Sequence, residues 1–445
     1  MRTALRTLGL LLFLFVLLGL ALHSIPGGTL LGRWTPRYAL GLLLLTGLGW
    51  PWWKLLVFLT EDTVFTGSEG QEVRIPAPLK GKVFLTLVLL VFLPVEFALH
   101  RRANRRTRKD WKKFHPFLQH QNRPNRGSMH TNSEGFRGEP LTLDKPAGRT
   151  RILFLGGSTV YCMRTTWEKT HPRLLEKALR ERRPDLDLEL QNCGLDWYTT
   201  EHSLINWLFR LRDFKPDIVI LFHGINDLCR SFSPKTLAYG PPRRDYAHFF
   251  GPVARLALGH TRQGQIPHPY TVAWAFDRLL YSDLLYPPVK RGPVETFASL
   301  PSFERNLRLI VRNLRADGVK LVLATQPSLY RPDLDDEARG RLWMLYEFCE
   351  TDGRVPDLPS ITAGMAKFNA VTRAVARETG TPLVELAENV PRDLEHFVDD
   401  CHYTEAGNAR VAELMTAGVL EAKVLPAPGR APSETPPGDG AARDR

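Results

Sequence analysis

The chain has 445 residues, enough for one large domain with an extension or for two ordinary domains, and it carries a formal net charge of +12 at pH 7. Eight Lys or Arg and one Asp lie within residues 101–113, directly after an apolar run. This pattern favours a membrane flank over nucleic-acid binding, because anionic headgroups attract Lys and Arg. Five widely spaced cysteines without a C-x-x-C pair argue against a disulfide framework and against a zinc site.

Three apolar runs predict that residues 1–100 form a membrane region with two or three transmembrane helices. Residues 5–22 and 83–99 are nearly uninterrupted, whereas a Pro and a Lys interrupt residues 38–59, and whether this second run spans is left open. A helix needs about 20 predominantly apolar residues to cross the hydrocarbon core of a bilayer. A removable signal peptide is the alternative interpretation of the first run.

The polar segments around these runs are expected to be connections. Residues 61–80 are predicted to be a loop, and residues 101–127 a basic juxtamembrane linker. Counted over three spans, the positive-inside rule places the part of the chain after this linker in the cytoplasm. At the other end, residues 423–445 are rich in Pro, Gly and Ala, which predicts a disordered tail.

Short apolar strands alternate with amphipathic helices from residue 128 to residue 422. The expected strands are 151–156, 188–192, 217–222, 320–325 and 382–386, and the expected helices are 167–182, 201–212, 303–316, 363–378 and 405–422. This alternation predicts an α/β domain with a parallel sheet covered by helices on both faces, a three-layer αβα sandwich. Active sites of such sheets lie beyond the carboxyl ends of the strands.

The first candidate segment, Gly156-Gly157-Ser158-Thr159, directly follows the first strand. Its two glycines allow a sharp turn, and the helix that follows points backbone N–H groups at whatever the Ser158 hydroxyl attacks. By itself the segment would also suit a phosphate-binding turn. However, no Lys follows at P-loop spacing, and the three-glycine dinucleotide fingerprint is absent.

Two further segments end the second and third strands. Gly194 leaves its backbone N–H accessible to a substrate oxygen, and the Asn226 side chain can donate a hydrogen bond to a developing oxyanion. Ordinary turns also use Gly and Asn-Asp, so neither segment is decisive by itself. Asp227 is expected to be a structural hydrogen-bonding group rather than a catalytic one.

The fourth segment runs from Asp399 to His402 and precedes the last helix. An Asp three residues before a His can accept a hydrogen bond from imidazole Nδ1, which leaves Nε2 free to take a proton from a serine. The spacing favours Asp399 over Asp400 as the partner of His402, and Asp400 is expected to be solvated. The Cys401 side chain is expected to point away from His402.

In this order, the four segments resemble those of the SGNH or GDSL-type hydrolase family, which is named for Ser, Gly, Asn and His residues in four sequence blocks. Ser158, Gly194, Asn226 and His402 occupy these positions, and Asp399 completes the Asp-x-x-His block. The resemblance covers about residues 128–422.

The resemblance implies a flavodoxin-like sheet and a membrane-anchored serine esterase. Ser158 would be the nucleophile, His402 the general base and Asp399 the third triad member. The N–H groups of Ser158 and Gly194 and the Asn226 side chain would form the oxyanion hole. The substrate would be a carboxylic ester, an acyl or acetyl group on a lipid or saccharide, and no cofactor or metal is expected. The alternative is an O-acyltransferase that acts on a polysaccharide with the same triad.

Two features bear on the subfamily and the location. Gly157 stands where the Gly-Asp-Ser signature of the family has Asp, and residues 131–137 look like the lead-in strand of bacterial membrane-anchored members. Ester-bearing envelope polymers lie in the periplasm, so analogy places the enzyme domain there, opposite to the positive-inside expectation. We therefore predict a multi-pass protein of a bacterial inner membrane and leave the side of the enzyme domain open.

Residues 228–302 are expected to be an insertion, far longer than the usual strand-to-helix connection of about two to six residues. The insertion starts beside the predicted site and is rich in Pro and aromatic residues. Two interpretations stay open. The rings pack a small helical subdomain onto the core, or they belong to a cap that lines the acyl or sugar pocket.

Overall fold

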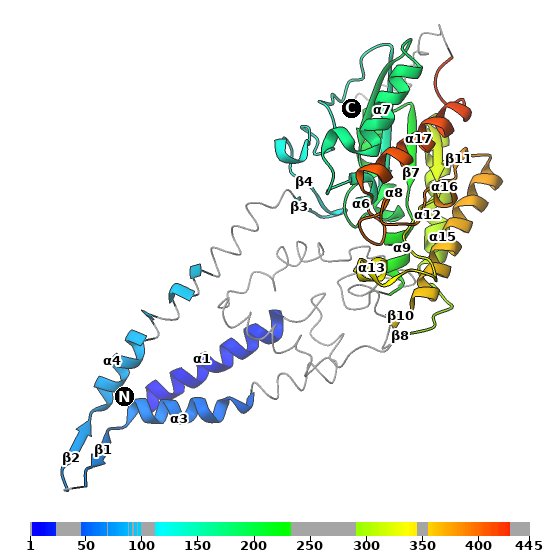
Figure 1. Cartoon of the computed structure of the whole chain (residues 1–445). Helices are drawn as coiled ribbons and strands as arrows, with labels where there is room; N and C mark the ends of the chain where they lie inside the picture. The colour runs from blue at the N-terminus through cyan, green and yellow to red at the C-terminus, as the bar shows by residue number, and fades with distance from the viewer. Residues whose placement is uncertain are drawn as a thin grey trace, which may run out of the picture. The chain divides into compact units, whose positions relative to one another are not determined.

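The computed structural model describes residues 2–23, 46–98, 112–232, 291–344 and 355–427, with short gaps at residues 69, 88, 91–92 and 96. The described residues fall into two compact units, one before residue 111 and one after it, and each is treated by itself (Figure 1). Most of the predicted insertion, residues 233–290, and most of the predicted tail, residues 428–445, lie outside the described residues.

The described part of the first unit includes helices and an antiparallel hairpin. These are α1 (Arg2–His23), α3 (Gly49–Thr60), β1 (Thr63–Thr66), β2 (Glu72–Ile75) and α4 (Ala77–Leu87). Helices α1 and α3 are joined by a hydrogen bond from Trp52 Nε1 to the Gly9 carbonyl, at 3.0 Å. The antiparallel hairpin lies within residues 61–80, so the prediction of a loop there is wrong. Thr, Val, Phe and Ile on either side of a Gly-containing turn are the strand-forming signal that this prediction overlooked.

None of the helices in the described part of the chain is long and apolar enough to cross a membrane. The described helices therefore do not support the predicted spans at residues 5–22, 38–59 and 83–99. Residues 24–45, which contain the start of the second run, lie outside the described residues.

The second unit is built on a five-stranded parallel sheet, which confirms the predicted sheet type. Its strands are β5 (Arg149–Gly156), β6 (Asp187–Asn192), β7 (Ile218–Phe222), β9 (Lys320–Ala324) and β11 (Leu383–Val384). All neighbouring pairs are parallel, in the order β11-β9-β7-β5-β6. Strand β7 is buried over its whole length and β5 over nearly all of it, as expected for central strands covered on both faces.

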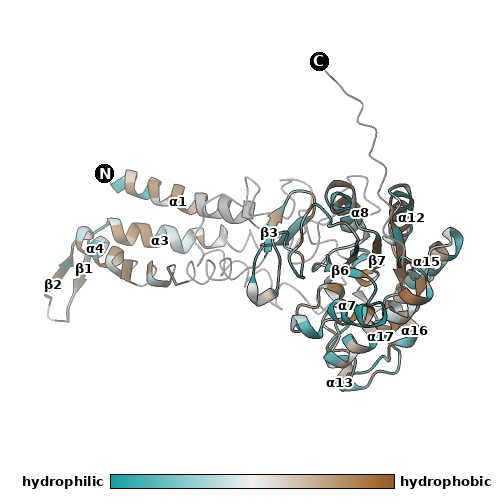
Figure 2. Cartoon of the chain, turned by 90° about the horizontal axis from the view of Figure 1, so that it is seen from above, coloured by the Kyte–Doolittle hydropathy of each residue, from teal (hydrophilic) through white to brown (hydrophobic). Residues whose placement is uncertain are grey.

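Helices cover both faces of this sheet, in agreement with the predicted three layers. Figure 2 shows α8 (Thr200–Phe209) and α12 (Leu300–Ala316) on one side of β6 and β7, and α7 (His171–Arg182) and α17 (Glu405–Glu421) on the other. Helix α15 (Leu358–Thr379) packs against α12 and β9. Buried apolar residues of α12 recur at helical spacing from Phe303 to Leu314, so this helix turns one apolar stripe to the sheet.

Short elements complete the second unit. They are β3 (Lys112–His115), β4 (Gln119–Asn122), η2 (Gly127–Met129), α6 (Ser158–Tyr161), η3 (Trp167–Lys169), η4 (Leu211–Phe214), α9 (Ile225–Arg230), β8 (Arg291–Gly292), α13 (Asp336–Gly340), β10 (Val355–Pro356) and α16 (Leu386–Asn389). Strands β3 and β4 pair as an antiparallel hairpin, and β8 pairs with β10.

Strand order places a reversal of direction at β5. The chain runs from β5 outward to β6 on one side and then returns to β7 on the other side of β5. The carboxyl ends of β5 and β7 therefore diverge into loops on opposite faces, and the crevice between such loops is where open parallel sheets bind their ligands. Ser158 follows β5 and Asn226 follows β7, so the topology itself brings these two predicted site residues to one place.

Two predictions for the residues before β5 need correction. The hairpin of β3 and β4 lies within the predicted linker 101–127, and buried Lys112 forms an ion pair with buried Asp196 of the second unit. Residues 131–137 are no strand. They form a bend at Gly135 (φ +78°), held by isolated bridges from Arg137 to Thr131 and to Asn192. Patterns in the sequence report local structure, so they could not reveal the long-range partners Asp196 of Lys112 and Asn192 of Arg137.

The predicted disordered tail also begins too early. Val424 and Leu425 are buried, and Arg183 donates a hydrogen bond to the Pro426 carbonyl at 2.9 Å. The two apolar side chains after α17 join the main core, which the Pro- and Gly-rich composition of the stretch obscures.

Candidate active site

The nucleophile turn is packed against its neighbours so closely that glycine is required. A Cβ atom on Gly156 would lie 2.7 Å from the Phe222 carbonyl oxygen of β7, and one on Gly157 would lie 2.6 Å from the Asn226 amide nitrogen. Gly157 stands where the family signature has Asp. The Asn226 side chain fills the space that a side chain at residue 157 would need.

Ser158 begins helix α6 and faces the ring of His402. Its hydroxyl lies 2.8 Å from His402 Nε2, within hydrogen-bond distance for a proton that the ring nitrogen accepts. The backbone N–H of Ser158 is among the first N–H groups of a helix, which have no partner within the helix. The first segment thus joins the fourth across 244 residues of chain.

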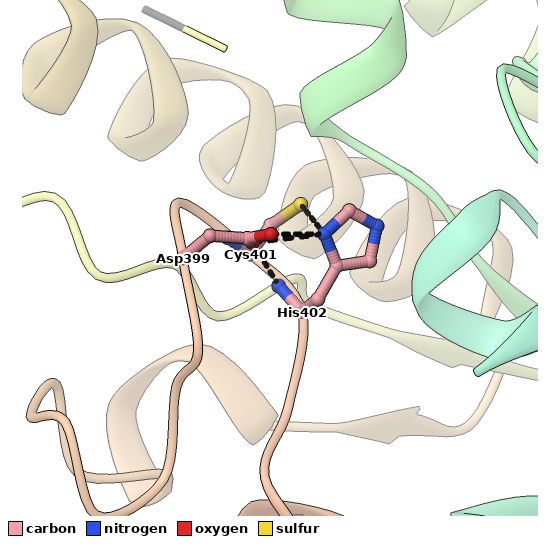
Figure 3. Close-up of side chains that lie close together, drawn as sticks. All are labelled: Asp399, Cys401 and His402. Carbon is pink, nitrogen blue, oxygen red and sulfur yellow. Dashed lines mark hydrogen bonds and ion pairs between the residues drawn. The ribbon is translucent and has the colours of Figure 1, made fainter. Parts of the chain in front are cut away.

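Asp399 holds the other side of the His402 ring. Figure 3 shows the carboxylate against Nδ1, at 2.8 Å from Oδ1 and 2.9 Å from Oδ2. Asp399 Oδ1 also accepts backbone N–H groups of Cys401 (3.1 Å) and His402 (2.9 Å). The loop is closed by a hydrogen bond from the Val398 N–H to the His402 carbonyl, so the Asp-x-x-His spacing is a rigid turn.

The buried pair has opposed pKa shifts. Burial of Asp399, which is 2% exposed, would raise its pKa, but hydrogen bonds from His402 and Trp343 outweigh burial and hold the pKa well below its ordinary range. Burial would lower the pKa of His402, yet the hydrogen bond to Asp399 and the negative charge of that carboxylate raise it well above the ordinary value. The carboxylate therefore stays ionised and favours the protonated ring.

Trp343 and Arg164 reach Asp399 without any signal in the sequence. The Trp343 indole N–H donates to Asp399 Oδ2 at 2.9 Å, and Arg164 Nη1 lies 3.3 Å from the same oxygen. Trp343 lies 56 residues before Asp399, in a loop with no motif around it. Only the fold brings these side chains to Asp399.

Two of the predicted oxyanion donors, the Gly194 N–H and the Asn226 side chain, lie next to the turn at Ser158 and already have acceptors. The Gly194 N–H donates to Asn192 Oδ1 at 3.0 Å, and a Cβ on Gly194 would lie 2.8 Å from the Tyr161 nitrogen of α6. Asn226 Nδ2 donates one hydrogen bond to the Tyr198 carbonyl at 2.9 Å. A side-chain amide has two N–H groups, so Asn226 keeps a second donor.

The predictions for Asp400 and Cys401, the two residues between Asp399 and His402, are wrong. Asp400 is fully buried rather than solvated, and it accepts hydrogen bonds from the Tyr330 hydroxyl (2.7 Å) and from the Trp343 N–H (2.8 Å). The loop that carries Trp343 folds over Asp400, which sequence spacing could not show. Cys401 Sγ lies 3.8 Å from His402 Nδ1 instead of pointing away (Figure 3). Asp227 accepts hydrogen bonds from the Thr200 hydroxyl and N–H, as a structural group would.

Asp399, Cys401 and His402 are the single group of three potential metal-ligating residues found among the described residues, with ligand atoms within 4.8 Å of one another. The carboxylate and Nδ1 are bonded to each other, and burial raises the pKa of the Cys401 thiol to about 11, so the thiol is protonated at neutral pH. A metal would need the thiolate and a released imidazole nitrogen. The group fits a hydrogen-bonded acid and base better than a metal centre.

A small pocket opens beside Ser158 and His402. Its other lining residues are Thr159, Cys162, Met163, Arg164, Thr165, Tyr403 and Asn408. They come from α6 and the turn after it, and from the residues around the start of α17, so the pocket is lined by the same two segments that carry Ser158 and His402.

The fold and the site together define a class of protein: a three-layer α/β protein in which Ser, His and Asp are hydrogen-bonded in series at the topological switch point of the sheet. Comparison with protein families matches residues 154–410 to the GDSL-like Lipase/Acylhydrolase family. The chain belongs to this family, which confirms the resemblance seen in the four segments. It is therefore an enzyme that hydrolyses ester bonds.

Among curated proteins, none matches the chain. Solved structures similar to it include an α/β hydrolase, LAE5, from the metagenome of Lake Arreo, with 16% identity, a TM-score of 0.37, and coverage of 61% of this chain and 96% of the other. The acetylxylan esterase Axe2 from Geobacillus stearothermophilus shows 15% identity and a TM-score of 0.37, with 62% and 96% covered. A putative GDSL-like lipase from Parabacteroides merdae shows 13% identity and a TM-score of 0.36, with coverage of 62% of this chain and 97% of the other. Membership of the family, rather than these likenesses, carries the assignment of the activity.

The contact between residue 157 and Asn226 predicts a specific defect. Gly157→Ala should displace the Asn226 amide, because the new Cβ would lie 2.6 Å from Asn226 Nδ2. We expect kcat/KM for a short aryl ester to fall between about tenfold and hundredfold, the scale at which misplaced site groups act. Gly340→Ala is the matched control, since no atom lies within 4 Å of its added Cβ. Equal activity of the two variants would contradict the interpretation.

Proposed function

We propose that this chain is a serine esterase in which Ser158 is the nucleophile, His402 the general base and Asp399 the group that orients the base. The observation that carries the proposal is the continuous series of hydrogen bonds, with 2.8 Å between Ser158 Oγ and His402 Nε2 and 2.8 Å between His402 Nδ1 and Asp399 Oδ1. A serine hydroxyl is a weak nucleophile at neutral pH, and an adjacent base oriented by a carboxylate is the arrangement that activates it.

The reaction then proceeds in two displacements. Ser158 Oγ attacks the ester carbonyl carbon while His402 takes the hydroxyl proton, and the carbonyl oxygen becomes an oxyanion. Collapse of this intermediate breaks the bond to the alcohol, which leaves with the proton from His402. Water then attacks the acyl-serine, with His402 again accepting the proton, and the carboxylic acid and free Ser158 are released. Ionised Asp399 stabilises the imidazolium in both steps.

The oxyanion would be held by the N–H groups of Ser158 and Gly194 and by the Asn226 side chain. Asn226 has a second N–H beyond the one bound to Tyr198, and the Gly194 N–H would be shared between the oxyanion and Asn192. One such donor typically contributes about 3 kcal/mol to stabilisation of the transition state. The substrate would be a carboxylic ester with an acyl or acetyl group on a lipid or a saccharide.

Removal of the nucleophile or the base tests the proposal. Ser158→Ala and His402→Ala should each lower hydrolysis of a short aryl ester by about three orders of magnitude or more, because triad members act as a unit. A circular dichroism melt controls for folding. Near-normal turnover by Ser158→Ala would refute the nucleophile. The same assay with an added sugar acceptor addresses O-acyl transfer, and product transfer that outpaces hydrolysis would favour the acyltransferase alternative.

The pH dependence tests the roles of the base and the carboxylate. His402 must be neutral to accept a proton, so kcat/KM should rise with pH through the raised pKa of His402, with a midpoint above the ordinary histidine value of about 6.5. Asp399→Asn removes the charge that favours the protonated ring, so it should lower the plateau strongly and shift the midpoint to lower pH.

Asp400→Asn is the matched control for this profile. Asp400 binds Tyr330 and the Trp343 backbone rather than the ring, so the variant should lose stability and keep the midpoint of the wild-type chain. A midpoint that moves in Asp400→Asn and stays in Asp399→Asn would show that the wrong carboxylate was assigned.

We also propose that the first hundred residues attach the enzyme to a membrane, on a side that the positive-inside rule and the analogy with envelope enzymes assign differently. Support comes from the three apolar runs, from exposed apolar side chains such as Leu8 (64% exposed) and Leu90 (67% exposed), and from the basic stretch 101–113. The full chain should sediment with membranes and stay there in alkaline carbonate. Its release into the carbonate supernatant would contradict integral anchoring.

A further inference from the structure

We propose that Arg164 binds an anionic group of the substrate, a carboxylate or a phosphate close to the ester bond, and so determines which esters the enzyme prefers. The inference rests on the proposed role of Ser158 as nucleophile, because it places the anion relative to the bond that Ser158 attacks.

Arg164 lies at the mouth of the catalytic pocket. It follows α6 in the turn of residues 162–166 and lines the same pocket as Ser158 and His402. Its side chain is 54% exposed, so the guanidinium is accessible to a molecule that enters from solvent. A substrate whose ester carbon reaches Ser158 Oγ therefore occupies a pocket that Arg164 also lines.

Hydrogen bonds from a second arginine, Arg137, hold the turn that carries Arg164. Buried Arg137 donates hydrogen bonds to the carbonyls of Tyr161 (2.8 Å) and Cys162 (2.5 Å) before Arg164 and of Thr165 (2.6 Å) after it. The backbone on both sides of Arg164 is thus anchored to the core. A binding group on an anchored turn loses less conformational entropy when it takes up a ligand.

The charge of Arg164 is not needed for the triad. Asp399 already accepts hydrogen bonds from the His402 ring and N–H, the Cys401 N–H and the Trp343 indole, and its contact with Arg164 Nη1 is a longer 3.3 Å. Among the described residues, Arg164 forms no hydrogen bond with another protein group besides this ion pair. A guanidinium has five N–H donors in a planar fork, which matches two oxygens of a carboxylate or phosphate.

The remaining walls of the pocket carry no competing negative charge. Burial raises the pKa of the Cys162 thiol to about 12 and that of the Tyr403 phenol well above its ordinary value, so both are neutral at pH 7. Among the described residues that line the pocket, Arg164 and His402 are the groups that can be positively charged. An anion on the solvent side of Arg164 therefore meets no negative charge from the residues that line the pocket. The nearest carboxylate is that of Asp399, which lies 3.3 Å from Arg164 Nη1 and does not line the pocket.

Matched pairs of esters test the proposal. Each pair has an anionic member and its neutral methylated form: 4-acetoxybenzoate and its methyl ester, phenyl hydrogen glutarate and its methyl ester, and 4-acetoxyphenyl phosphate and its dimethyl ester. The measured quantity is the ratio of kcat/KM for the anionic member to that for the neutral member. The pairs place the charge on the alcohol side as carboxylate, on the acyl side, or on the alcohol side as phosphate.

In at least one pair, Arg164→Gln should lower this ratio tenfold or more, and Arg164→Lys should give an intermediate ratio because it keeps the charge without the fork. Arg180→Gln is the matched control, since Arg180 is 52% exposed, forms one ion pair and does not line the pocket, and its ratio should equal that of the wild-type chain. If Arg164→Gln lowers kcat/KM equally for both members of every pair, Arg164 acts only through Asp399. If kcat/KM changes for neither member, Arg164 does not act on the reaction at all. Either result would show that the proposal is wrong.

A binding measurement separates the failure of this inference from the failure of the proposed function. Calorimetry with the Ser158→Ala chain and each of the three anionic esters should show, for at least one of them, affinity that is lost when Arg164→Gln is added. Arg164-dependent binding without any Ser158-dependent hydrolysis would refute the serine esterase and retain the anion site. Ser158-dependent hydrolysis with binding and ratios independent of Arg164 would refute the anion site alone.

Discussion

The close approach of three strand ends governs this active site. No side chain fits at Gly156, Gly157 or Gly194, where an added Cβ would lie within 2.8 Å of β7, Asn226 or α6. Because the chain passes through these positions as bare backbone, the ends of β5, β6 and β7 can meet around Ser158. This contact gathers Ser158, the neighbouring N–H groups and the Asn226 amide, and the pocket beside Ser158 is also lined by His402 and Arg164.

The adjacent buried carboxylates Asp399 and Asp400 bind different hydrogen-bond donors and therefore have different roles. Asp399 faces the His402 ring and the Trp343 indole, which keep it ionised beside the base. Asp400 faces the other way and binds the Tyr330 hydroxyl and the backbone at Trp343, so it ties down the loop that delivers the indole. Burial of an ionised carboxylate costs free energy unless hydrogen-bond donors surround it. Here Trp343 serves both carboxylates, because its indole N–H binds Asp399 and its backbone N–H binds Asp400.

Much of the fold and of the site could be predicted from local patterns. The parallel sheet, the helices on both faces and the places of Ser158 and His402 follow from apolar strands alternating with helices and from short motifs at strand ends. The Asp-x-x-His turn was predictable because its hydrogen bonds join residues within three positions of one another. The hairpin of β1 and β2 differs from the predicted loop although its strand signal is local, because a polar, Gly-containing stretch fits a loop as well as a hairpin turn.

The sequence by itself determined the chemistry that local spacing can encode: a nucleophile after the first strand, a base with its own carboxylate before the last helix, and an α/β sheet to carry them. Only the tertiary structure decided which distant groups complete the site. Asp400 became buried because the loop at Tyr330 and Trp343 folds over it, and Arg164 reached Asp399 across 235 residues of chain. Such contacts depend on how elements pack in three dimensions, and one sequence carries no period or motif that records the packing partner.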